Sequence, residues 1–100
     1  MEVLPLSRNG YKVLLCLEAG VDNAAEIHEI TKIPKEDVKA SLSFLIERKL
    51  ISSSGLFAFL SREITADGMQ ALSVYKNVYG NEEDAKEVEQ ELAGEDEDGN

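Results

Sequence analysis

The sequence predicts one small α+β domain over residues 1–80, built from four helices and a two-stranded β-hairpin. Apolar residues recur at helical spacing in four separate segments of this range. Between the third and fourth segments that spacing gives way to serines, a glycine and aromatic residues at every second position, a pattern typical of strand, turn and strand. A chain of 100 residues that is 43% hydrophobic can bury one core and no more.

The first helix is expected over residues 8–19 and has the widest apolar arc. Ser7 suits its N-cap and Gly20 its C-terminal stop. Cys16 lies inside the apolar run VLLCL, so we interpret it as a buried core residue. A single cysteine cannot form an internal disulfide, which fits a reducing cytoplasm.

A short and a longer helix follow, over residues 24–31 and 35–48. Asn23, with Glu26 three residues later, resembles a capping box, and Pro34 suits the start of the longer helix. The longer helix repeats apolar residues at helical spacing, and its other face is polar. Its inward residues are Val38, Leu42, Leu45 and Ile46.

The hairpin is expected to turn near Ser54 and Gly55, and its second strand is apolar on both faces. A fourth helix then begins after the N-cap Thr65 and ends at Gly80, with Asp67 favourable in its first turn.

Charge divides the chain at residue 80. Residues 1–80 hold ten acids and nine bases, for a net charge of −1, whereas residues 81–100 hold ten acids and one base, for −9. We expect residues 81–100 to form an acidic, partly disordered tail. This tail is either a solubilising end or a phosphate mimic that folds back onto Lys32, Lys35 and Lys39. The composition favours the first alternative.

The order of elements carries a family resemblance. The stretch AAEIHEITKIPKEDVKASLSFLIERKLI and the later phrase ITADGMQAL resemble winged helix-turn-helix transcriptional regulators, and in particular the small MarR-like, IclR-like or archaeal types. The resemblance implies sequence-specific binding to double-stranded DNA, with the helix over 35–48 in the major groove. The residues placed to contact DNA are Lys32, Lys35, Glu36, Lys39, Ala40, Ser43 and Arg62.

The predicted wing departs from the family pattern, because its tip SSSGLFAF has no basic residue. An apolar wing favours an alternative function, in which the domain binds another protein. Either the fourth helix and the tail cover the second face of the wing, or a partner does. We predict a homodimer whose interface includes Phe57, Phe59, Leu60, Met69, Leu72, Tyr75 and Tyr79.

Other classes of protein fit poorly. The sequence has no glycine-rich phosphate loop, metal-ligand spacing or nucleophile–base pair, so we expect no enzyme activity, no metal and no cofactor. The apolar run VLLCL covers 5 residues, far short of the ~20 that a membrane-spanning helix needs. The opening MEVLPLSRNG does not have the pattern of a secretory signal, and we therefore expect a cytoplasmic location.

Overall fold

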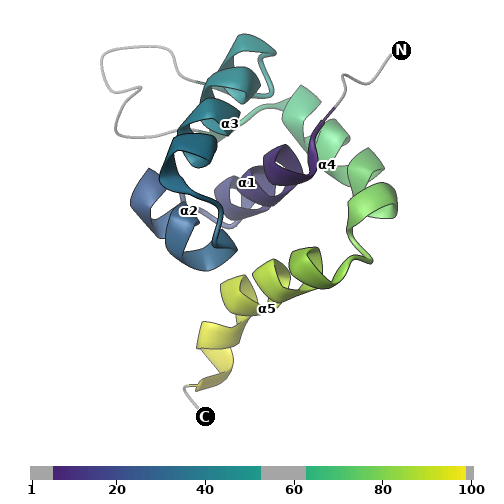
Figure 1. Ribbon diagram of the computed structural model, residues 1–100. Coiled ribbons are helices and arrows are strands. Elements are labelled where there is room, and N and C mark those ends of the chain that lie inside the picture. The colour runs from purple at the N-terminus through teal and green to yellow at the C-terminus, as the bar shows by residue number, and fades with distance from the viewer. Residues whose placement is uncertain (1–5, 53–62, 99–100) are drawn as a thin grey trace.

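The computed structural model describes residues 6–52 and 63–98, with side chains described as far as residue 93. Over these residues the chain forms five α-helices and one two-stranded antiparallel sheet, which is an α+β arrangement (Figure 1). The elements are α1 (Arg8–Glu18), α2 (Ala24–Thr31), α3 (Lys35–Glu47), β1 (Ile51–Ser52), β2 (Glu63–Ile64), α4 (Ala66–Tyr79) and α5 (Glu83–Asp98).

Helix α1 is the centre of the fold, because the other four helices pack around it (Figure 1). Every residue of α1 from Gly10 to Leu17 is buried, so the helix has no solvent-facing stripe over two turns. Burial raises the pKa of the Cys16 thiol to about 12. This thiol therefore stays protonated at neutral pH, as expected of a core cysteine.

Side-chain caps begin three of the helices, at the residues that the sequence predicts. The Ser7 hydroxyl accepts a hydrogen bond from Gly10 N at 3.0 Å, and Thr65 Oγ1 accepts one from Gly68 N at 3.1 Å. The side-chain oxygen of Asn23 accepts from both Ala25 N and Glu26 N. Each cap satisfies backbone N–H groups that have no partner within the helix.

Helices α2 and α3 pack against each other and against α1. Ile27 of α2 and Val38 and Leu45 of α3 are fully buried in this contact region, and Leu42 is nearly so. The inward stripe of α3 is therefore the one that its sequence predicts, while Ile46 is only partly buried.

The small sheet pairs Ile51 with Ile64 and Ser52 with Glu63. Residues 53–62, which include the predicted turn and the apolar residues Phe57, Phe59 and Leu60, lie outside the described residues. The base of the hairpin is anchored by Thr65, whose backbone N–H donates to Leu50 O at 3.0 Å.

The acidic segment after Gly80 differs from the expected tail. It forms α5, which packs on α1 and α2 and buries Ala85 and Val88 in the core. The reason is that Ala85, Val88 and Leu92 share one face of the helix, so a sequence rich in acids still has a narrow apolar stripe. The domain therefore extends past residue 80.

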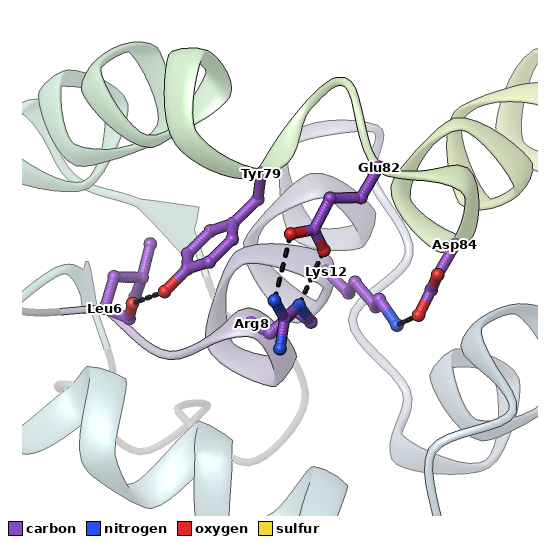
Figure 2. Close-up of polar contacts among 6 residues, drawn as sticks. All are labelled: Leu6, Arg8, Lys12, Tyr79, Glu82 and Asp84. Carbon is purple, nitrogen blue, oxygen red and sulfur yellow. Dashed lines mark hydrogen bonds and ion pairs between the residues drawn. The ribbon is translucent and has the colours of Figure 1, made fainter.

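Two ion pairs fix the start of α5 on α1 (Figure 2). Arg8 donates through two nitrogens to the two carboxylate oxygens of Glu82, at 2.6 and 2.9 Å. Lys12 donates to Asp84 at 3.0 Å, and only 9% of the Lys12 side chain is exposed. The hydrogen bonds from Arg8 and Lys12 lower the pKa values of Glu82 and Asp84 below their ordinary range.

In the part of the chain that the structure describes, no helix is long and apolar enough to cross a membrane.

Candidate nucleic-acid interface

The turn between α2 and α3 is held by the buried hydroxyl of Thr31. This hydroxyl donates to Ile27 O at 2.7 Å and accepts from Ile33 N at 3.2 Å. The last turn of α2 is thus tied to Ile33 in the middle of the turn between the helices, and Ile33 is itself buried in the core. Such a buried anchor limits the freedom of α3 to pivot against α2.

His28 braces the same turn from outside. Its Nδ1 lies 2.7 Å from Ile33 O. Because a carbonyl oxygen can only accept, Nδ1 must carry the proton in this contact. His28 therefore has a structural role in the turn.

The outer side of α3 is exposed along most of its length. All five residues of α3 that the sequence assigns to DNA contact are exposed: Lys35, Glu36, Lys39, Ala40 and Ser43. Lys35 and Lys39 are four residues apart and so lie on one side of the helix. Glu36, Ala40 and Ser43 form a neighbouring row, and the two small residues Ala40 and Ser43 lie near the middle of the helix. Small side chains at that position allow another molecule to approach the helix closely.

The charge around α3 differs in sign from that of the whole chain. Residues 32–49 hold five bases and three acids, for a net charge of +2, in a chain of net charge −10. The positive charge is not continuous, because Glu36 and Asp37 lie in the first turn of α3. Acids at that position are favourable to the helix itself, since they face the positive end of its dipole.

Arg48 and Lys49 provide positive charge at the other end of α3. The Arg48 guanidinium lies 5.1 Å from the centroid of the Phe44 ring, a cation–π contact that holds it against the helix. Lys49 is exposed and has a positive φ of 61°. Neither residue is among those that the family resemblance assigns to DNA contact, although two basic residues directly after the last helical turn are a signal visible in the sequence.

No protein-family model, curated protein or solved structure matches this chain.

The remaining residues predicted to contact DNA lie elsewhere. Lys32 is exposed in the turn, with Nζ donating to Glu29 O at 3.0 Å. Arg62 lies outside the described residues. Arg8, another basic residue that could approach a phosphate, is engaged by Glu82, and the hydrogen bond from that pairing raises the pKa of the guanidinium further.

The predicted self-association surface is partly used within the chain. Leu72 is buried, and Tyr79 packs against Tyr11 and donates its hydroxyl to Leu6 O at 2.9 Å (Figure 2). Tyr75 stacks on Tyr79, with ring centroids 5.7 Å apart. Phe57, Phe59 and Leu60 fall outside the described residues. The large apolar residues that α4 does expose are Met69 (44% exposed), Val74 (39%) and Val78 (55%).

Proposed function

We propose that this chain is a winged helix-turn-helix protein that binds double-stranded DNA with α3 in the major groove, as a sequence-specific transcriptional regulator. The observation that carries the proposal is the exposed outer side of α3, which has small residues at its centre and lysines beside them. A helix packed across another helix in this way can enter the major groove with its first turns at the base edges.

Three of the exposed residues of α3 can form specific contacts with DNA. Lys35 and Lys39 can donate to phosphates or to the acceptor atoms of guanine. Glu36 can accept from the amino group of cytosine, while Ala40 and Ser43 allow the helix axis to come close to the bases. A contact between Glu36 and cytosine would contribute specificity, because a carboxylate near phosphates costs affinity unless it is paired.

The charge distribution supports modest affinity that falls as salt rises. Phosphate contacts by lysine release counterions from DNA, so binding weakens as salt rises. A net charge of +2 over residues 32–49 is small for a DNA-binding surface. We therefore expect binding that is weak on random DNA and that depends on correct base contacts.

A salt titration of binding to duplex DNA tests the proposal. In the double variant Lys35→Ala/Lys39→Ala, the slope of log affinity against log salt should fall by roughly two, because each lost phosphate contact lowers it by roughly one. Lys86→Ala is the matched control, since Lys86 is an exposed lysine on α5. The proposal is wrong if the double variant binds as the unmodified chain does.

The alternative function is a protein-interaction module, and the exposed apolar residues of α4 favour it as a second candidate. Met69, Val74 and Val78 are all more than a third exposed, and no described residue covers them. Val74 and Val78 are four residues apart on one side of α4, whereas Met69 lies on the side opposite Val78. A homodimer through the side with Val74 and Val78 would bury these two residues and would also carry two copies of α3, as DNA-binding dimers do. A protein partner could use the same residues without any DNA.

A further inference from the structure

Two lysines adopt a backbone conformation that lysine rarely takes. Lys32 has φ 65° and Lys49 has φ 61°, and among the described residues they are the only non-glycine residues with positive φ. L-residues enter this left-handed region at an energetic cost, because Cβ approaches a carbonyl oxygen. Lys32 is the C-cap of α2, three residues before α3 begins, and Lys49 is two residues after α3 ends.

Helix α1 ends in the same type of turn as α3, but with glycine at the left-handed position. After α3, Lys49 N donates to Ile46 O and Leu50 N donates to Leu45 O, each at 2.9 Å. After α1, Gly20 N and Val21 N make the same two bonds, to Leu17 O and Cys16 O. Both ends are Schellman motifs, and Gly20 and Lys49 occupy the same left-handed position. Glycine is favoured at this position because it adopts a positive φ without steric cost, so the presence of lysine at residue 49 is not explained by the turn itself.

The surrounding structure forces Lys49 into its conformation. The Thr65 hydroxyl lies 2.9 Å from Lys49 O and 3.0 Å from Leu50 O, and the Leu50 side chain is buried. The backbone on both sides of Lys49 is therefore fixed by contacts that do not involve its side chain. A strained residue held in this way is an indication of function.

The Lys49 ammonium makes no stabilising contact with the described part of the chain. Lys32 does make such a contact, because its Nζ donates to Glu29 O near the end of α2. For Lys49 Nζ there is no hydrogen bond or ion pair with any residue that the structure describes, and the side chain is exposed. An exposed cation that makes no such contact, at a position where glycine would cost less, fits an external anion.

We propose that Lys49 is a further phosphate contact of the DNA interface, and that Lys49 and Lys32 contact the sugar–phosphate backbone of DNA near the two ends of α3. This inference rests on the proposed DNA-binding function. With 13 residues, α3 is roughly 20 Å long at ~1.5 Å per residue. The major groove is ~12 Å wide, so a helix of this length in the groove allows residues just beyond its two ends to reach phosphates at the edges of the groove.

Two substitutions at residue 49 separate charge from strain. Lys49→Gly removes both, so it should raise the Tm by roughly 2–6 °C and lower DNA affinity about three- to tenfold at moderate salt. Lys49→Gln keeps the strain and removes the charge, so it should leave the Tm unchanged and lower affinity to the same extent. In both variants the salt slope should fall by roughly one. The control Lys86→Gln, on the surface of α5, should leave the Tm, the DNA affinity and the salt slope unchanged.

The outcomes are distinguishable. If Lys49→Gly and Lys49→Gln bind DNA with unchanged affinity and slope while Lys35→Ala/Lys39→Ala does not, the inference is overturned and the proposed function stands. If Lys49→Gly does not raise the Tm, lysine at this position has a structural benefit and the argument from strain fails. If the unmodified chain binds no duplex DNA, the proposed function and this inference fail together.

Discussion

Gly68 is the residue at which the packing of α4 depends on the absence of a side chain. Gly68 is buried against the residues that precede β1, and a Cβ built there would collide with the carbonyl oxygen of Leu50 and with the side chain of Ile64. The Leu50 carbonyl cannot move away, because it accepts from Thr65. A side chain at this position would therefore push α4 away from the sheet.

We expect Gly68→Ala to destabilise the fold by roughly 1–3 kcal/mol, the range for overpacking a buried site. In an exposed helix the same change stabilises by about 1 kcal/mol, so the sign of the effect is itself diagnostic. Chemical denaturation measures it, with Ser73→Ala on the exposed side of α4 as the control. A stabilised Gly68→Ala variant would contradict the close approach of α4 to Leu50.

Residue-scale prediction from sequence works where the signal is local. The caps Ser7, Asn23 and Thr65 are each confirmed, because a cap bonds N–H groups only two or three residues away. The left-handed conformation of Lys49 is local too, but lysine gives no sign of it. Its conformation is decided by Thr65, sixteen residues further on.

At the scale of elements, α5 is the largest difference between expectation and structure. The sequence predicts the helix boundaries of α1 to α4 within a residue or two, since periodicity and caps agree there. Residues 81–100 are mostly acidic, and the three apolar residues Ala85, Val88 and Leu92 are a weak signal for a core helix. The basic residues that pair with Glu82 and Asp84 lie more than seventy residues earlier in the chain, so no local sequence pattern connects them.

Truncation of the chain after residue 80 should therefore weaken the fold, which would not be expected of the partly disordered tail that the sequence predicts for residues 81–100. We expect a loss of roughly 3–5 kcal/mol, because burial of Val88 alone contributes roughly 2 kcal/mol and Ala85 adds to it. Removal of Asp84 also leaves the buried Lys12 without its partner. Urea denaturation would measure the loss. A chain that stops after residue 93 keeps every described side chain of α5 and serves as the control; equal stability of the two truncated forms would contradict this role of α5.

The ion pairs at the start of α5 should make stability depend on pH in acid. The pKa values of Glu82 and Asp84 are lowered by hydrogen bonds from Arg8 and Lys12. A carboxylate whose pKa falls on folding stabilises the folded state above its ordinary pKa, and that contribution is lost as pH falls through the folded pKa. We expect the Tm to decline as pH drops below roughly 4, the ordinary range of these groups.

Glu82→Gln/Asp84→Asn should lower the Tm at pH 7 and make the profile between pH 5 and pH 3 flatter than that of the unmodified chain. Glu83→Gln changes an exposed acid in the same turn and is the control. Parallel profiles for the double variant and the unmodified chain would show that these pairs do not couple protonation to folding.

At the scale of the whole molecule, the exposed apolar residues of α4 lead to a prediction about association. If the chain dimerises through α4, Val78→Lys should raise the dissociation constant of the dimer about tenfold or more, because it places an ammonium in an apolar contact. Ser73→Lys, at another exposed position of α4, should have a smaller effect. Sedimentation equilibrium at micromolar concentration measures both. If the unmodified chain is strictly monomeric at micromolar concentration, this dimer is excluded.

The contacts among Tyr11, Tyr75 and Tyr79 also determine which part of the protein its ultraviolet spectroscopic signals report on. The chain has three tyrosines and no tryptophan. Tyr11 and Tyr79 have ring centroids 5.8 Å apart, and Tyr75 stacks on Tyr79, so all three chromophores gather where α1 meets α4. Its intrinsic fluorescence and near-ultraviolet dichroism therefore arise mainly from one junction. A change in either signal during a titration would locate the event at the α1–α4 contact, without any added label.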